Sequence, residues 1–177
     1  MRLLKGIRAT TQDYSPKQKI DGLRLIELRR FVDDSGSFAE LLRIGENGEA
    51  QAISGFSLLG GQTSCSEVEP GAVKAWHLHY KQVDVWCVLP GQRLLVGLWD
   101  LREDSPTANA KMRLVLGAGR AQLLVIPSGV AHGCANLSGD PVYIIYFINR
   151  QFNPDNPDEH RIRWNQAGKD FWEMKKE

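Results

Sequence analysis

Short segments with the composition of β-strands recur from residue 22 to residue 148, and turn residues separate them. Apolar runs such as RLLVGLWDLR, AQLLVIP and VYIIYFI alternate with the polar turns VDDSGS, LPG and SGDP. Long helical periodicity is nearly absent. About ten short strands with such spacing predict an all-β sandwich or barrel, here a jelly-roll barrel.

The chain has 177 residues, enough for one domain with a sizeable core. We divide it into an N-terminal arm (1–20), a barrel (21–150) and a polar C-terminal tail (151–177). The arm is expected either to lack order or to pack on a second subunit. Within the tail, AGKDFWEMKK predicts a short helix that lays Phe171 and Trp172 on the body.

Composition excludes several partners and compartments. The 22 basic residues nearly cancel the 21 acidic ones, so no bulk charge draws the chain to nucleic acid or to an anionic membrane. No apolar run approaches the length of a membrane span, and the start carries no apolar signal core. Three widely spaced cysteines do not form a disulfide framework. These observations predict a cytoplasmic protein.

Three of the four histidines lie in two β-rich segments. His77 and His79 are two positions apart, so in a strand both side chains point to the same face. Asp84 follows on the next run, and His132 lies further along in IPSGVAHGCAN. Three imidazoles and a carboxylate suit a divalent transition metal. The alternative is that these are ordinary hydrogen-bonded histidines of the barrel wall.

Both histidine segments resemble the cupin motifs, and the order of the two motifs is kept. The first reads Gly71, His77-Leu78-His79, Asp84 and Gly91, and the second Pro127 to His132 followed by Asn136. In cupins these motifs belong to a double-stranded β-helix, the cupin form of the jelly-roll barrel, which often holds a metal. The resemblance implies the same fold here.

A closer resemblance extends from Gly22 to Trp172 and is to the dTDP-4-dehydrorhamnose 3,5-epimerases and related dTDP-sugar isomerases. The matching segments are DDSGSFAE, KAWH, DLREDSPT, IPSGVAHG and RIRWN. The resemblance implies a homodimer that acts on a dTDP-4-keto-6-deoxyhexose, by proton abstraction next to the ketone and without a cofactor. Histidine suits that task because its pKa lies near ambient pH.

The resemblance also implies site residues. The base falls on His77 and the acid on Tyr146, with Tyr143 as a competitor three positions earlier. Positions that hold the nucleotide diphosphate fall on Lys74, Gln62 and His132, and Phe38 and Glu40 reach across the dimer. Strict strand alternation would put Lys74 and His77 on opposite faces, so we expect a bulge or a strand end between them.

Two positions differ from the family. Asp84 stands where the family has the lysine that holds the enolate, and Gln166 stands where it has the aspartate that pairs with the base. A metal held by His77, His79, Asp84 and His132 would replace the lysine as a Lewis acid. Two alternatives therefore stay open beside the epimerase: a metal-dependent cupin acting on another small polar substrate, and a non-catalytic nucleotide-sugar-binding cupin.

Overall fold

The computed structural model describes residues 4–15 and 19–174, and every regular element in these two ranges is a β-strand. The strands are β1 (Arg24–Glu27), β2 (Arg30–Asp33), β3 (Gly36–Ala39), β4 (Gln62–Val68), β5 (Val73–Leu78), β6 (Asp84–Val88), β7 (Arg93–Asp100), β8 (Lys111–Gly117), β9 (Gln122–Ile126), β10 (Val130–Ala135), β11 (Val142–Ile148) and β12 (His160–Arg161).

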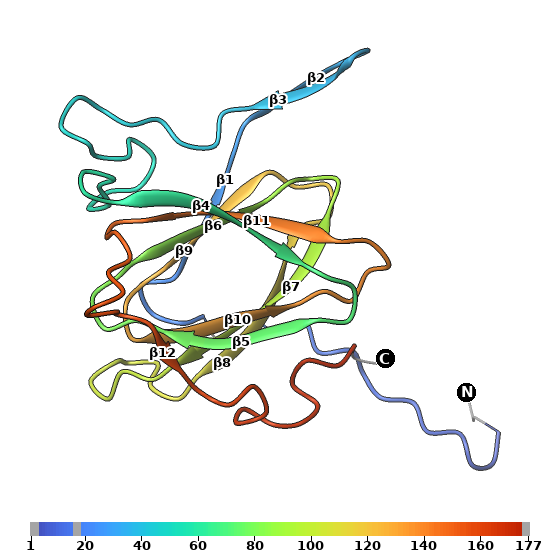
Figure 1. Ribbon diagram of the computed structural model, residues 1–177. Coiled ribbons are helices and arrows are strands. Elements are labelled where there is room, and N and C mark those ends of the chain that lie inside the picture. Colours follow the sequence, from blue (N-terminus) through green and yellow to red (C-terminus); the bar gives the residue numbers. More distant parts are fainter. Residues whose placement is uncertain (1–3, 16–18, 175–177) are drawn as a thin grey trace.

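Ten strands form two five-stranded antiparallel sheets, in the orders β1-β9-β6-β11-β4 and β12-β5-β10-β7-β8, which face each other (Figure 1). Alternation along β6 explains the layering. Trp86 and Val88 point into the space between the sheets, whereas Val85 and Cys87 point outward into a second apolar layer. The predicted all-β jelly roll of the cupin type is confirmed.

The space between the sheets is apolar at one end and polar at the other. Leu94, Val96 and Leu98 of β7 and Leu116 of β8 fill the apolar end and are fully buried. Asp84, His79 and His132 are also buried, at the polar end. Burial of charged groups costs free energy unless they are paired, so this end of the barrel is where a function is expected.

A bulge in β5 aims the polar side chains. The pairing of β10 with β5 passes from His132 opposite His77 to Cys134 opposite Lys74, so β5 uses one extra residue. The two backbones lie close here: a Cβ on Gly133 would come within 2.5 Å of the Ala75 Cβ. The extra residue turns Lys74 toward the face that carries His77, as expected from the sequence.

The DLREDSPT segment has a structural role. Asp100 is completely buried and accepts hydrogen bonds from Arg102, Ser105 and Thr107 at 2.6–2.9 Å. These bonds hold the pKa of Asp100 well below its usual 3.8 against the raising effect of its burial. The specific sequence of this segment therefore closes the turn between β7 and β8.

The predicted C-terminal helix is wrong for the described part of that segment. Residues 167–173 form successive turns, in which Phe171 N donates to Gly168 O and Glu173 N donates to Asp170 O. The rings of Phe171 and Trp172 both pack on Trp76, at 5.0 and 4.7 Å between centroids. Adjacent helical residues point about 100° apart, so this packing favours turns. Residues 175–177 lie outside the described residues.

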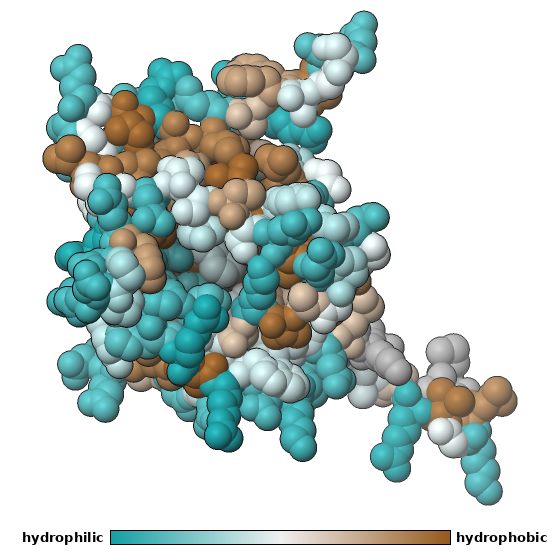
Figure 2. Space-filling model, viewed as in Figure 1, coloured by the Kyte–Doolittle hydropathy of each residue, from teal (hydrophilic) through white to brown (hydrophobic). Residues whose placement is uncertain are grey.

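Two segments project from the barrel (Figure 1). The arm, of which residues 4–15 and 19–20 are described, extends outside the barrel, and at its end Ile20 packs into the core. The β2–β3 hairpin extends above the sheet that contains β4 and carries the exposed residues Phe31, Val32 and Phe38. Hydrophobic surface gathers between this hairpin and the barrel (Figure 2). No helix among the described residues is long and apolar enough to cross a membrane.

Candidate active site

His77 is held between two side chains from β12 and the residue just before it. Its Nδ1 lies 2.7 Å from Glu159 Oε1, and its Nε2 lies 2.9 Å from Arg161 Nη1. A guanidinium only donates hydrogen bonds, so His77 Nε2 is the acceptor and Nδ1–H donates to Glu159. These partners assign a neutral imidazole with its lone pair on Nε2, the form that a general base requires.

Electrostatics favour that neutral form. Burial lowers the pKa of His77 below its usual 6.5, and the neighbouring His132 and Arg161 lower it further, while Glu159 opposes them. The pKa of Glu159 is itself lowered, because its contacts with His77, His79 and Arg161 outweigh burial. A neutral base beside an ionised carboxylate results.

A second cluster lies deeper in the barrel and consists of His79, Asp84 and His132. Their ligand atoms lie within 4.8 Å of one another, and all three side chains are buried. Asp84 accepts hydrogen bonds from Gln82 Nε2 at 2.7 Å and from Trp86 Nε1 at 3.1 Å. His77, the fourth predicted metal ligand, is engaged by Glu159 and Arg161 instead.

The two histidines of the cluster differ in their bonding. His79 Nδ1 contacts the carbonyl oxygen of Asp158, and Gln82 Nε2 lies 3.3 Å from His79 Nε2. His132 Nδ1 lies 3.0 Å from Val130 O, and its Nε2 lies 3.5 Å from Asp84 Oδ2. Both nitrogens of His132 face acceptors, which is the environment of an imidazolium.

The charges of this cluster agree with its bonding. Burial would raise the pKa of Asp84, but His132, His79 and Gln82 hold it at about 2. Burial lowers the pKa of His132, but Asp84 more than compensates and raises it. The cluster therefore contains an ionised carboxylate that stabilises a positive charge on His132.

Tyr146 lies on the inner face of β11, and Tyr143 does not. Tyr146 is paired in register with Trp86 and packs against the central core. Tyr143 is exposed and its hydroxyl donates to Glu67 Oε1 at 2.7 Å. Of the two tyrosines considered from the sequence, Tyr146 alone lines the cavities beside His77 and His79.

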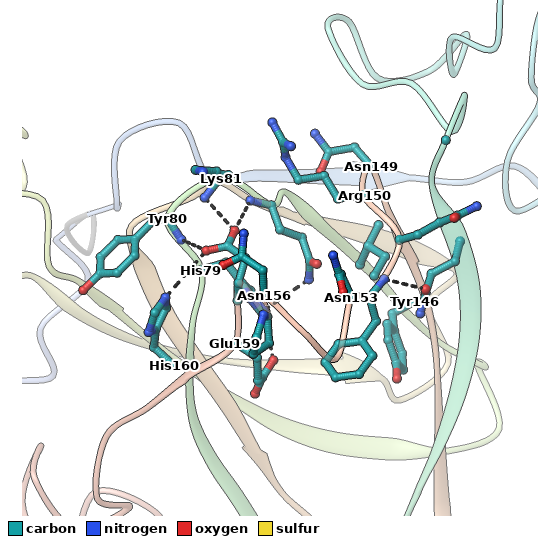
Figure 3. Close-up of a pocket in the computed structure, with 18 of the residues that line it drawn as sticks. His79, Tyr80, Lys81, Tyr146, Asn149, Arg150, Asn153, Asn156, Glu159 and His160 are labelled. Atoms are coloured by element: carbon teal, nitrogen blue, oxygen red, sulfur yellow. Dashed lines mark hydrogen bonds and ion pairs between the residues drawn. The ribbon is translucent and has the colours of Figure 1, made fainter.

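Two adjoining cavities open over these groups. One of about 410 Å³ contains His77, Lys74, Arg161, Glu159, Tyr146 and Ser66 in its wall. The other, of about 830 Å³, is polar and runs between residues 79–82 and the 149–160 segment (Figure 3). Tyr146 lies toward one end of the view and His160 toward the other. Gln62 also lines this cavity. Tyr146, Phe152 and Glu159 border both cavities.

Of the other predicted substrate-binding residues, Lys74 and Gln62 border the two cavities, whereas Phe38 and Glu40 do not. Lys74 Nζ contacts Ser66 Oγ at 3.2 Å at the edge of the smaller cavity. Gln62 Oε1 accepts from Phe152 N at 2.9 Å. Phe38 and Glu40 lie on and beside the projecting hairpin, where Glu40 pairs with Arg43 at 2.6 Å. This chain alone does not bring Phe38 and Glu40 to the cavities.

Sequence reasoning missed Glu159 and Arg161. It expected the partner of His77 at position 166, but Gln166 is exposed in a turn whose backbone N–H donates to Arg163 O. The acid and the cation instead come from EHR, at β12 and just before it. Glu159 and Arg161 are two positions apart, so in a strand both side chains point to the same face, and this spacing could have indicated the pair. The segment was instead interpreted as a polar tail.

The fold and site define a cupin-type jelly roll with a cavity bordered by a neutral imidazole, a carboxylate paired with it and a phenol. Residues 17–172 match the model of the dTDP-4-dehydrorhamnose 3,5-epimerase family. The chain belongs to this family of dTDP-sugar epimerases, and the sequence-based assignment to the isomerases is confirmed at this level.

Relatives agree with this assignment. The chain is 44% identical over 146 residues to the spore coat polysaccharide biosynthesis protein SpsL of Bacillus subtilis (strain 168), covering 82% of this chain and 91% of that protein. A crystal structure of a dTDP sugar isomerase from Desulfovibrio desulfuricans G20 matches with a TM-score of 0.70 and 28% identity, over 83% of this chain and 87% of that one.

A further neighbour shares the fold. The epimerase RmlC of Legionella pneumophila Philadelphia 1, solved in complex with dTDP-4-keto-L-rhamnose, matches with a TM-score of 0.71 and 24% identity. The match covers 89% of this chain and 82% of that one.

Proposed function

We propose that this protein epimerises a dTDP-linked 4-keto-6-deoxyhexose at a carbon next to the ketone, with His77 as the base and Tyr146 as the acid. The observation that carries this proposal is the pairing of His77 Nδ1 with Glu159 at 2.7 Å in a cavity that Tyr146 also borders. Family membership supports the substrate class. Proton abstraction next to a ketone needs a positioned base of this kind.

The proposed reaction conserves every atom. His77 Nε2 takes the proton from the carbon next to the ketone, and the electron pair of that C–H bond forms the enolate. The Tyr146 hydroxyl then gives a proton to the same carbon from the other face, which inverts it. Exchange with water returns a proton to the tyrosinate and removes one from His77. Glu159 keeps Nδ1–H in place and stabilises the imidazolium that forms.

The enolate needs positive charge nearby, and Asp84 replaces the lysine that supplies it in the family. We assign this charge to His132, whose ring stacks on His77 at 5.9 Å between centroids and 11° between planes. Asp84 raises the pKa of His132, so the carboxylate maintains a cation next to the ring of the base. His132 thereby has a different role from the diphosphate contact expected from the sequence.

The nucleotide end is assigned to the rim of the cavities. Lys74 and Gln62 would contact the diphosphate side of the substrate, since both border cavities that also contain Tyr146. Phe38 lies on the projecting hairpin and Glu40 directly follows it, and from there both would reach a second copy. A homodimer is supported by the exposed Phe31, Val32 and Phe38 and by the apolar surface beneath the hairpin. Three free cysteines suit a cytoplasmic location.

We propose that the reaction needs no cofactor, and a divalent transition metal is the alternative. His79, Asp84 and His132 would hold such an ion, because imidazole and carboxylate are suitable donors and both Nδ1 atoms contact backbone carbonyls that orient the rings. A metal bound there would polarise the ketone oxygen as a Lewis acid. His77 would remain outside its coordination shell.

Solvent exchange tests the proposed function. Incubation with a dTDP-4-keto-6-deoxyhexose in D₂O should place deuterium next to the ketone, as detected by NMR and mass spectrometry. The His77→Asn variant should lose this exchange and still bind dTDP. Absence of deuterium with the wild-type protein, or exchange by His77→Asn at the wild-type rate, would refute the assignment.

A further inference from the structure

Arg161 covers the one atom of His77 that must accept a proton. The pairing of β12 with β5 places Arg161 opposite His77, and its Nη1 lies 2.9 Å from His77 Nε2. Since a guanidinium has no acceptor, the hydrogen bond uses the lone pair of Nε2. While this contact lasts, the imidazole has the correct tautomer for a base but cannot react with a substrate.

Arg161 is held loosely enough to leave. Its side chain is 60% exposed, and its other partner among the described residues is Glu159 Oε1, 2.9 Å from Nε. Arg102 offers a contrast, since Asp100, Ser105 and the carbonyl of Asp21 all hold its guanidinium. Rotation of the Arg161 side chain alone would uncover Nε2, without movement of a strand.

The chemistry of the cavity indicates what would draw Arg161 away. Lys74 lies in the same cavity wall, so two cations border the space above His77. A diphosphate offers several charged oxygens to a guanidinium. Bidentate, charge-assisted bonds of this kind are stronger than one bond to a neutral imidazole.

Of the groups that face His77, only Arg161 among the described residues contacts the nitrogen that must accept the proton. Glu159 contacts Nδ1, and His132 of β10 stacks on the ring face. Lys74, on the same strand as His77, is bound to Ser66 and to the carbonyl of Glu67. Among the described residues, Arg161 is the donor to Nε2.

We propose that Arg161 masks the base and that the diphosphate of the bound nucleotide sugar removes the mask. This inference rests on the proposed function and deepens it: the diphosphate is needed for proton abstraction as well as for affinity. A keto-sugar without the nucleotide would enter the cavity and meet a blocked His77. Arg161 is thus the residue that restricts turnover to diphosphate-linked sugars.

A substrate supplied in two pieces tests the mask. The pieces are a free 4-keto-6-deoxyhexose in D₂O and saturating dTDP, and deuterium incorporation is followed by NMR. For the wild-type protein, dTDP should accelerate exchange into the free sugar by about tenfold, the equivalent of one hydrogen bond removed. Arg161→Met should reach the accelerated rate without dTDP and gain nothing from it. With the intact nucleotide sugar this variant should show a raised KM and a retained kcat.

Two controls separate masking from anion binding. Arg163→Met removes an exposed arginine two residues away and should behave as wild type. Lys74→Gln should weaken dTDP binding yet keep the acceleration at saturating dTDP. Equal exchange by the wild-type protein with and without dTDP would overturn the mask, as would an Arg161→Met variant that still needs dTDP.

A structure of the wild-type protein with dTDP gives a second test that needs no variant. Arg161 should contact the phosphates and leave His77 Nε2 uncovered. Arg161 still bonded to His77 beside a bound dTDP would overturn the inference. Failure of this inference can be told apart from failure of the proposed function. If the wild-type protein exchanges deuterium into the intact nucleotide sugar, but dTDP does not accelerate exchange into the free sugar, the masking role of Arg161 is refuted and the proposed epimerase activity stands.

Discussion

Glu159 and His77 are 82 positions apart in the chain, yet Glu159 Oε1 accepts a 2.7 Å hydrogen bond from His77 Nδ1. The carboxylate beside the imidazole therefore comes from the residue just before β12, whereas the resemblance had predicted the partner of His77 at Gln166. The partner of His77 thus comes from a different part of the sequence than the resemblance implied.

Replacement of Glu159 by Gln should lower kcat by about 10²–10³-fold, because an amide orients the ring but stabilises its charged form poorly. The KM for the nucleotide sugar should change little. The measurement is steady-state epimerisation together with dTDP binding by calorimetry.

Gln166→Ala is the matched control for Glu159→Gln, since Gln166 is exposed in a turn. It should retain wild-type kcat. A large loss for Gln166→Ala together with an active Glu159→Gln would show that position 166 keeps the role it has in the family.

The sequence was sufficient for most of the barrel and for five of the residues in the polar end of the barrel and in the adjoining cavity walls. His77, Asp84, His132 and Tyr146 lie in strands, and His79 directly follows β5; the apolar alternation of these strands sets the direction of every second side chain. The expected bulge near Lys74 is present for the same reason. Local pattern thus predicts which face a side chain takes.

Long-range contacts explain what the sequence did not reveal. β12 has two residues, too few for a periodic pattern, and only its pairing with β5 gives Glu159 and Arg161 their positions. The C-terminal segment had helical composition, but packing of Phe171 and Trp172 on Trp76 decided its conformation. Tertiary contacts override local preference in both segments.

Tyr146→Phe should lower kcat by about 10²–10³-fold, because the hydroxyl that returns the proton is lost. Deuterium exchange should persist in part, since His77 still removes a proton. Tyr143→Phe, which removes an outward hydroxyl bonded to Glu67, should remain within about twofold of wild type. The opposite ranking of the two variants in an epimerisation assay would contradict the orientation of β11.

The Asp84–His132 pair should make stability depend on pH. The raised pKa of His132 gives stabilisation that is complete below 6.5 and is lost as pH rises through the folded value. The lowered pKa of Asp84 gives stabilisation that is present above 3.8 and is lost as pH falls toward about 2. Asp84→Asn should therefore cost about 3 kcal/mol of unfolding free energy between these limits, and less at higher pH.

Urea unfolding at about pH 5 and about pH 9, with chelator present, measures this difference. Asp104→Asn, at an exposed carboxylate, is the control and should change little at either pH. An Asp84→Asn deficit of equal size at both pH values would argue against a charged His132.

Chelation should leave activity intact. Protein treated with EDTA and freed of metal should exchange deuterium at the untreated rate, because His77 and Tyr146 lie outside the His79–Asp84–His132 cluster. The measurement is exchange rate against metal content by mass spectrometry. A fall in rate that Zn²⁺ or Co²⁺ restores, and that His79→Gln abolishes, would favour the metal-dependent alternative.

The hairpin prediction concerns assembly. Substitution of both Phe31 and Phe38 by Ser should convert a dimer into a monomer, because these rings, 6.3 Å apart, form the exposed apolar face of β2–β3. The monomer should keep its circular dichroism spectrum and bind dTDP weakly. Leu89→Ser, at an exposed leucine in the turn after β6, is the control for analytical ultracentrifugation. An unchanged sedimentation coefficient in the double variant would exclude the hairpin from the interface.

The position of β12 in the chain has a consequence for synthesis. A ribosome completes β1 to β11 before Glu159 and Arg161 emerge. During synthesis, His77 is therefore in place before its carboxylate partner and the arginine that contacts its Nε2. Both arrive within three residues and join β5 together. With the proposed roles, the growing polypeptide acquires the carboxylate partner of its base and the arginine that covers the base in the same folding step.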